Sequence, residues 1–327
     1  MTQSIVPASY DKSAAIVVLP PVGGGRLRSP KLRSWLARSD LSFAGAPQER
    51  LECVLAELGK AMPSEGLAAL RMWGQTGDRP TVWIAGADPV YLEARLDHLC
   101  LHALRRTGVP ASDMRPLVDH LQKTLGSNSD FGFARVGSFG YVTARSTMDT
   151  ATFPAYAIDQ LVPNEFLPSG DESIGHRNLT SEVEMALHDH EINLRRQQEG
   201  EPPINSLWIW GGGMAPEQDT VPHPPLFSDD PLLRGYWKSK TGVEEHWPGS
   251  IAGCLELAVG GFVATTPEAD DDVDLLEACL FELSEILYSK RVSKLILLFR
   301  DGVRAEVHRS HALRLWRRRN PLLEVPA

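Results

Sequence analysis

The sequence lacks long apolar runs, an excess of positive charge and closely spaced cysteines. No apolar run approaches the ~20 residues that a membrane-spanning helix needs, and residues 1–15 show no basic segment followed by an apolar stretch. The formal net charge is −9, which disfavours nucleic acid and anionic lipid as partners because both are negatively charged. The sequence therefore predicts a cytoplasmic protein with no membrane segment and no nucleic-acid partner.

Cysteine pairs and familiar catalytic motifs are also missing. None of the cysteines lies within four residues of another, so no zinc-ribbon spacing exists. In a reducing cytoplasm we expect four free, buried thiols: Cys53, Cys100, Cys254 and Cys279. No P-loop, no Gly-x-Ser-x-Gly elbow and no His-Glu-x-x-His motif occurs. His98 and His102 have metal-ligand spacing on a helix, but no third ligand is identifiable, so we expect no metal and no cofactor.

Short apolar strands alternate with amphipathic helices along the chain. Predicted strands lie at residues 14–19, 81–85 and 205–210, and predicted hairpins at 131–144 and 294–307. Predicted helices lie at about residues 29–39, 49–60, 112–125, 181–200 and 273–287. This alternation favours an α/β fold with helices on both faces of the sheet, and the two β-hairpins favour a mixed sheet.

A change of pattern predicts how the chain is divided. Residues 146–180 carry few periodic signals and several turn formers. We therefore expect two α/β halves of similar size, at residues 1–150 and 151–327, with one continuous domain as the alternative.

The first candidate site is a glycine-rich turn after the first strand. Residues 23–25 are glycines, Arg26 and Arg28 follow, and Ser29 is predicted to cap a helix. Free N–H groups at a helix N-terminus attract anions, and the arginines would add charge-assisted hydrogen bonds. An ordinary glycine-rich turn is the alternative interpretation.

The second candidate site begins on the helix predicted at residues 181–200. If that helix is unbroken, His190 and Asn193 lie on its apolar side and face the sheet. A buried imidazole and a buried amide need hydrogen-bond partners, which either local groups or a ligand must supply.

The same candidate site continues into the strand that begins at Asn205. This strand places Trp208 and Trp210 on one face. It ends in three consecutive glycines, Gly211, Gly212 and Gly213. Ligands of open α/β sheets bind beyond the carboxyl ends of strands, where these glycines would lie. The alternative is a buried helix–strand unit whose polar side chains serve only packing.

Basic side chains cluster near the C-terminus. A solvated terminal helix is one interpretation, and a docking surface for an acidic protein partner is the other. The cluster consists of Arg309, Arg314, Arg317, Arg318 and Arg319.

Residues 187–213 also carry a family pattern. The run LHDHEINLRRQQEGEPPINSLWIWGGG resembles a stretch of the archaeal-type, cofactor-independent phosphoglycerate mutases. The matching positions are His190, Asn193, Arg196, Gly200, Pro203, Asn205, Ser206, Trp208, Trp210, Gly211 and Gly213. The chain as a whole resembles a proteobacterial family labelled phosphoglycerate mutase-like or pathogenicity-factor regulatory protein.

The resemblance does not extend to the metal half of the mutase site. Those mutases resemble alkaline phosphatases, in which acids and histidines hold two metal ions and a hydroxyl carries the phosphoryl group. Here the first strand ends in Pro20 and Pro21, with no acid before Gly23, and no Asp-His-Gly set lies near the C-terminus. Without those ligands, two-metal phosphoryl transfer lacks its charge stabilisation.

Two functional hypotheses follow. The first is a mutase-like protein without the two-metal site, acting as a regulatory or small-anion-binding protein, with a small phosphorylated metabolite as the candidate ligand. The second is a metal-independent enzyme acting on a small phosphorylated or carboxylated metabolite. In it, His190 is the acid/base, and Asn193, Asn205 and residues 211–213 hold the ligand. No complete set of nucleophile, base and stabiliser can be assembled from the sequence, which favours the first hypothesis.

Overall fold

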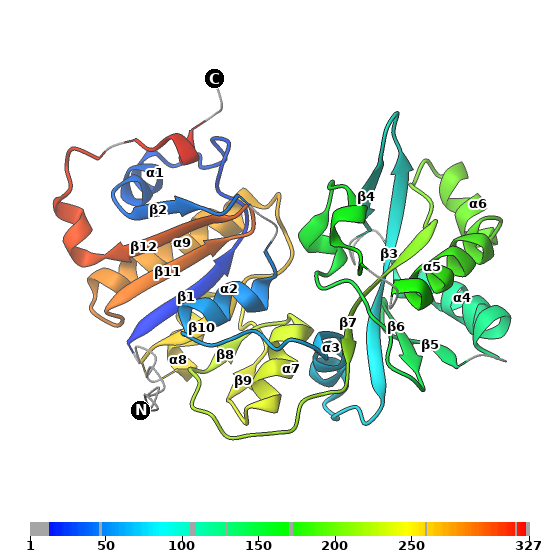
Figure 1. Cartoon of the computed structure of the whole chain (residues 1–327). Helices are drawn as coiled ribbons and strands as arrows, with labels where there is room; N and C mark the ends of the chain where they lie inside the picture. The colour runs from blue at the N-terminus through cyan, green and yellow to red at the C-terminus, as the bar shows by residue number, and fades with distance from the viewer. Residues whose placement is uncertain are drawn as a thin grey trace, which may run out of the picture. The chain divides into compact units, whose positions relative to one another are not determined.

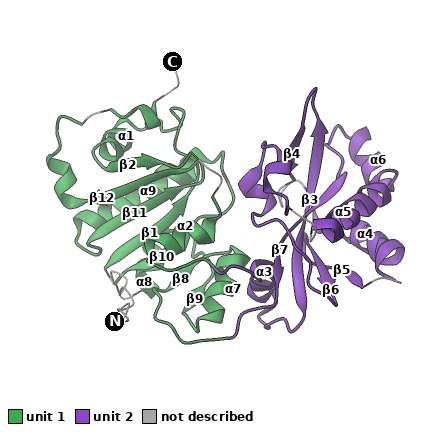
Figure 2. Cartoon of the chain, in the orientation of Figure 1, with its two compact units in different colours: residues 1–62, 218–327 green, residues 63–217 purple. Residues whose placement is uncertain are grey.

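The computed structural model describes residues 13–45, 48–104, 109–127, 130–169, 173–258, 260–317 and 319–324. The chain forms two compact units, which Figure 2 shows in different colours. Unit 1 consists of Met1–Met62 and Gln218–Ala327, and unit 2 of Pro63–Glu217. Unit 2 is therefore inserted into unit 1, and the division predicted at residue 150 falls inside unit 2.

Unit 1 is built on a seven-stranded mixed sheet in the order β2-β12-β11-β1-β10-β8-β9 (Figure 1). Its strands are β1 (Ala14–Leu19), β2 (Asp40–Phe43), β8 (Leu226–Phe227), β9 (Glu244–Glu245), β10 (Phe262–Thr265), β11 (Lys294–Phe299) and β12 (Val303–His308). β1 pairs in parallel with β10 and β11, whereas β11, β12 and β2 pair antiparallel. The parallel strands β1, β8, β10 and β11 therefore end at one edge of the sheet.

Helices cover both faces of this sheet (Figure 1). They are α1 (Pro30–Ala37), α2 (Arg50–Glu57), α7 (Pro231–Ser239), α8 (Ile251–Leu257) and α9 (Val273–Tyr288). Apolar side chains of α1, α8 and α9 share one core with alternate residues of β1 and β11, such as Val17 and Leu297. α2 packs on β1 and also against α7. Covered on both sides, β1 is buried along its whole length.

Unit 2 contains an antiparallel sheet organised around one long strand. Its strands are β3 (Trp83–Ala94), β4 (Leu99–Ala103), β5 (Phe131–Val136), β6 (Phe139–Ala144) and β7 (Ser206–Gly213). β7 pairs along one side of β3, while β6 and then β4 pair along the other side. β5 completes the sheet by pairing with β6.

The unit 2 sheet also carries helices on both faces. They are α3 (Leu67–Thr76), α4 (Ala111–Leu121), α5 (Ile174–Leu187) and α6 (Glu191–Gln198). α4, α5 and α6 share a core with residues such as Ala85, Leu207 and Ile209, and α3 packs on β3 and β7. The remaining short turns of helix are Gln122–Gly126, Ala155–Ile158, Pro163–Phe166, Arg309–Leu313 and Pro321–Leu323. Within the described ranges, every helix is too short or too polar to cross a bilayer.

The α/β fold and the mixed sheet predicted from the sequence are confirmed. The first strand, both hairpins and the long helix near the C-terminus lie where the periodicity places them. All four cysteines are free, as predicted, but Cys53 is only partly buried, whereas the other three are buried.

Two local predictions are wrong. The strand predicted at residues 81–85 does not end there but begins at Trp83 and continues to Ala94 as β3. Gly86 marks a close approach rather than a turn, because a Cβ there would lie 2.5 Å from Nε1 of Trp210. The helix assumed for His98 and His102 does not form, because this segment is the hairpin between β3 and β4.

Candidate functional site

The helix predicted at residues 181–200 is interrupted, which changes the position of His190. α5 ends at Leu187, and α6 begins at Glu191 with His190 as its N-cap. Nδ1 of His190 accepts a hydrogen bond from Ile192 N at 3.2 Å, and its ring lies edge-on to His120 with centroids 5.0 Å apart. The unbroken helix on which the predicted orientation depended therefore does not form, and the imidazole is half-buried at a helix start.

The two asparagines of the candidate site bind backbone groups. Asn193 is 2% exposed. Its Nδ2 donates to the carbonyls of Leu187 and Ile204, and its Oδ1 accepts from Ile204 N, at 2.8–2.9 Å. Asn205 makes a similar pair of bonds to the N–H and carbonyl of Leu92. Local groups thus supply the partners that the sequence required.

Arg196 is also held by the protein itself. Its side chain is 4% exposed, and Nη1 lies 3.3 Å from Oδ2 of Asp113 on α4. Nε donates to the carbonyl of Pro202 at 2.9 Å. This arginine therefore joins α6 to α4 and to the segment that precedes β7.

The tryptophans and glycines of β7 pack against neighbouring elements. Trp208 donates from Nε1 to the carbonyl of Phe153 at 2.8 Å. Gly213 has φ of +148°, and a Cβ there would lie 2.4 Å from the backbone nitrogen of Gly66, at the start of α3. The glycines therefore permit close packing of α3 on β7.

Trp210 belongs to a buried ion-pair network on the α3 face of the sheet. Its Nε1 donates to Oδ2 of Asp88 at 2.7 Å, and Arg71 contacts Oδ1 of Asp88 at 2.5 Å. Arg71 also donates from Nε to the hydroxyl of Tyr141 at 3.1 Å, and that hydroxyl donates to Gln75. Burial raises the pKa of Tyr141 to about 12. Burial opposes the charge of Arg71, but Asp88 and Tyr141 together outweigh it and raise the arginine's pKa.

The anion site predicted at the glycine-rich turn is filled by the protein's own carboxylates. The backbone N–H groups of Val22 and Gly23 both donate to Oδ2 of Asp301, at 2.8 and 2.6 Å. Those of Arg28 and Ser29 both donate to Oε1 of Glu277 at 2.7 Å. This turn therefore offers its N–H groups to two fixed side chains.

The two arginines after that turn point to acids of α9 and the segment before it. Arg26 donates to the carbonyl of Asp270 and contacts Asp271. Arg28 contacts Asp274 at 2.9 Å. Both arginines belong to unit 1, whereas His190 and residues 205–213 belong to unit 2.

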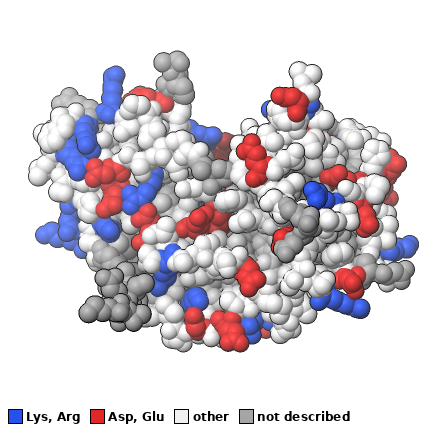
Figure 3. Space-filling view, viewed as in Figure 1, with Lys and Arg blue, Asp and Glu red and all other residues white. Residues whose placement is uncertain are grey.

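The basic cluster near the C-terminus does not form the predicted helix. Residues 309–313 form a 3-10 turn, and Arg318 lies outside the described residues. Arg314 and Arg317 both contact Asp40, and Arg309 donates to backbone carbonyls. On the face shown in Figure 3, basic and acidic side chains are interspersed. Three of the arginines in this cluster therefore already pair with a neighbouring carboxylate or with backbone carbonyls.

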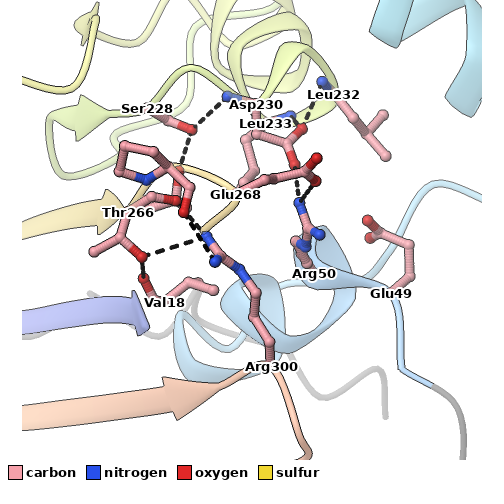
Figure 4. Close-up of polar contacts among 12 residues, drawn as sticks. Val18, Glu49, Arg50, Ser228, Asp230, Leu232, Leu233, Thr266, Glu268 and Arg300 are labelled. Carbon is pink, nitrogen blue, oxygen red and sulfur yellow. Dashed lines mark hydrogen bonds and ion pairs between the residues drawn. The ribbon is translucent and has the colours of Figure 1, made fainter. Parts of the chain in front are cut away.

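Sequence reasoning missed a polar cluster at the carboxyl edge of the unit 1 sheet (Figure 4). This edge cluster consists of Arg50, Ser228, Asp230, Thr265, Thr266, Glu268, Asp270 and Arg300. A signal was available, because several of these residues end or directly follow β8, β10 and β11, whose carboxyl ends meet at this edge. Asp230 caps α7 by accepting from Leu232 N and Leu233 N.

Two arginines form the centre of the edge cluster. Nη1 of Arg50 lies 3.2 Å from Asp230 and 2.7 Å from Glu268. The side chain of Arg300 is 5% exposed, and its Nη1 donates to Asp270 and to the carbonyl of Pro267, both at 2.9 Å. Burial, and then the positive charge of Arg50, lower the pKa of Arg300. Among the described residues, Nε of Arg300 has no hydrogen-bond partner.

The edge cluster does not fit a pair of metal ions. Its three carboxylates, on Asp230, Glu268 and Asp270, each contact an arginine, and the cluster contains neither histidine nor cysteine. In the part of the chain that the structure describes, the side chains placed to share a metal ion are those of Glu93, Cys100 and His102 in unit 2.

Two buried histidines are expected to lower the free energy of unfolding in mild acid. Burial lowers the pKa of His176 and of His223. One ring nitrogen of each lacks a hydrogen-bond partner among the described residues. The unfolded chain therefore binds more protons below about pH 6.5, the usual pKa of histidine. The free energy of unfolding should decrease as the pH falls from about 7.5 to 5.5, by at most about 1.4 kcal/mol per pH unit for each histidine.

Urea denaturation at a series of pH values measures this slope. His176→Gln should make it shallower, whereas His188→Gln, on an exposed side chain, serves as the control. An unchanged slope in His176→Gln would contradict the assignment.

No protein-family model matches the chain. Over 111 residues it is 29% identical to the 2,3-bisphosphoglycerate-independent phosphoglycerate mutase of Methanosarcina barkeri, covering 33% of this chain and 28% of the mutase. It is 33% identical to the Methanosarcina mazei enzyme over 111 residues, with the same coverage. These matches span less than a third of each curated relative.

Two solved structures align with most of the chain. The cofactor-independent phosphoglycerate mutase of Thermoplasma acidophilum is 16% identical, with a TM-score of 0.41 and coverage of 91% of this chain and 90% of that one. The PH0037 protein of Pyrococcus horikoshii is 13% identical, with a TM-score of 0.48 and coverage of 91% and 88%.

The class is thus an α/β protein of two units, one inserted into the other. Within that class, the chain resembles the archaeal-type cofactor-independent phosphoglycerate mutases, as residues 187–213 predicted.

Proposed function

We propose that this chain is a mutase-like protein without two-metal phosphoryl transfer, acting as a regulatory or small-anion-binding protein. The observation that carries the proposal is the pair of guanidinium groups, on Arg50 and Arg300, among the carboxylates of the edge cluster. They supply the positive charge that metal ions would otherwise bring to a carboxyl edge of parallel strands. The carboxylates that a divalent cation would need there are already paired with these two arginines.

The same arginines support a small phosphorylated metabolite as the ligand. Nε of Arg300 is a buried donor without a partner among the described residues, and such a donor favours binding of an acceptor. Glu268, which is 31% exposed, is the most accessible carboxylate of the cluster. A phosphate group would take its place on Arg50 and form charge-assisted hydrogen bonds.

Thermal shift with inorganic phosphate and with phosphoglycerate tests this proposal. Saturating anion should raise the Tm by several degrees, since ligand at 100 times its Kd stabilises by about 2.7 kcal/mol. Glu268→Ala should increase that shift by removing the competing carboxylate, and Arg300→Met should abolish it. Asp274→Ala removes an exposed acid outside the cluster and is the matched control.

A mutase assay tests the metal half of the proposal. We expect no interconversion of phosphoglycerates with Mn²⁺, and no Tm shift with Mn²⁺ alone. Metal-dependent turnover, or an anion shift that persists in Arg300→Met, would overturn the proposal.

The alternative, a metal-independent enzyme with His190 as acid/base, is supported by one observation. Burial and then the neighbouring His120 lower the pKa of His190, so its imidazole is neutral near pH 7, as a general base requires. Its Nδ1 is engaged in capping α6, however. The cytoplasmic location and an acidic protein partner for the basic C-terminal segment stay predictions from the sequence.

A further inference from the structure

We propose that the hairpin of β3 and β4 in unit 2 binds one thiophilic divalent cation, Zn²⁺, through Glu93, Cys100 and His102. The ligand atoms of these three side chains all lie within 4.8 Å of one another. The site belongs to unit 2, whereas the edge cluster belongs to unit 1, and the two share no residue. The inference is therefore independent of the proposed function.

The strand register brings the three side chains together. Glu93 on β3 is the direct partner of Cys100 on β4, and Tyr91 is the partner of His102. Because side chains of a strand alternate between faces, Cys100 and His102 lie on the same face as their partners. An antiparallel hairpin thus presents a thiol, an imidazole and a carboxylate from one surface, without the helix that the His98–His102 spacing suggested.

The donor set matches the chemistry of zinc. Thiolate sulfur, imidazole nitrogen and carboxylate oxygen are its usual protein ligands, at about 2.3, 2.0 and 2.1 Å. Tetrahedral geometry at these bond lengths separates the donor atoms by about 3.4–3.6 Å. The donor atoms, which lie up to 4.8 Å apart, therefore need to approach by roughly 1.4 Å at most to close on an ion. The thiolate disfavours Mg²⁺, Ca²⁺ and Mn²⁺, which prefer oxygen ligands.

Burial is graded across the site. Cys100 is 1% exposed, whereas the side chains of His102 and Glu93 are about one third exposed. The thiol thus forms the base of the site, and the other two ligands lie at its open side. With three protein ligands, the fourth position of the ion is left for a water molecule.

Existing contacts orient the ligands and do not block the ion. The rings of Tyr91 and His102 stack with centroids 5.7 Å apart, and His102 Nε2 lies 2.9 Å from Glu93 Oε2. An ion would replace this hydrogen bond. Arg95 also contacts Glu93, but its side chain is about half exposed, so the ion pair is weak and the arginine can turn into solvent.

Metal titration of the full chain tests the site. Protein treated with a chelator and kept reduced is titrated with Zn²⁺ against a chromophoric competitor. Co²⁺ serves as a second probe, because a thiolate–cobalt bond gives a charge-transfer absorption band. We expect one Zn²⁺ per chain, the cobalt band, and no competition from Mg²⁺.

Single variants assign the ligands. Cys100→Ser should remove the cobalt band, and both Cys100→Ser and His102→Ala should weaken Zn²⁺ binding by at least the roughly 10–100-fold seen when supporting groups of metal sites are removed. His102→Ala changes a partly exposed side chain, and circular dichroism checks that it folds. Cys53→Ser and His98→Ala are the matched controls and should bind as the unmodified chain does. Absence of Zn²⁺ binding, or binding by Cys100→Ser and His102→Ala as tight as that of the unmodified chain, would overturn the proposal.

Discussion

Replacing Asp88 by alanine is expected to destabilise unit 2 by about 3–5 kcal/mol, the usual cost of removing one partner of a buried ion pair. The change leaves Arg71, whose side chain is 5% exposed, without its carboxylate. It also removes the acceptor of Trp210 Nε1. The aromatic rings of Phe139, Tyr141 and Trp210 surround the guanidinium, and they offer no charge to replace Asp88.

Urea denaturation followed by circular dichroism measures this loss. The double variant Arg71→Met with Asp88→Leu should recover much of it, because it removes both charges together. Asp119→Ala breaks an exposed ion pair of the same unit, with Arg115, and should change the stability by less than about 1 kcal/mol. An Asp88→Ala variant as stable as Asp119→Ala would show that the pair contributes nothing.

The elements that sequence reasoning predicted well are those with a local physical cause. β1 is a short continuous apolar strand because it is covered on both faces, and the Asp301-Gly302 turn specifies its hairpin because Gly302 has φ of +84°. Ser29 was correctly predicted as a cap because its side chain accepts from Leu32 N in the first turn of α1.

The break between α5 and α6 could not be read from the sequence in this way. Residues 188–190 contain neither glycine nor proline. The ring nitrogen of His190 accepts the hydrogen bond of Ile192 N, a group that, at the start of α6, has no carbonyl partner within the helix. Histidine is an uncommon cap, so propensity favoured one continuous helix. Because one unbroken helix was assumed, His190 and Asn193 were both predicted on its apolar face.

The contacts of the candidate sites could not be predicted in the same way, because they join distant segments. Arg50 and Asp230 are 180 residues apart, and no local sequence pattern around either residue predicts their contact. The insertion of unit 2 into unit 1 separates such partners further. From one sequence, the carboxyl ends of parallel strands can be identified as the place where ligands bind. The same sequence does not indicate that Glu277 and Asp301 accept hydrogen bonds from the glycine-rich turn.

Replacing Asn193 by alanine is expected to cost about 2 kcal/mol or more, because two buried backbone groups lose their partner at once and each costs about 1–3 kcal/mol. These groups are the carbonyl and the N–H of Ile204, whereas the carbonyl of Leu187 still accepts from His190 N. The side chain joins the end of α5 to the residue before β7, so its loss should loosen both. The free energy of unfolding in urea measures the effect.

Alanine at His190 provides the matched comparison. Here the cap of α6 and the ring contact with His120 are lost, so the expected cost is about 1 kcal/mol, and His188→Ala, on an exposed side chain, should be neutral. The expected loss of stability is thus largest for Asn193→Ala, smaller for His190→Ala and smallest for His188→Ala, an order that follows from the hydrogen bonds to the backbone. If Asn193→Ala unfolds no more easily than His190→Ala, yet abolishes ligand binding, Asn193 serves a ligand and not the backbone.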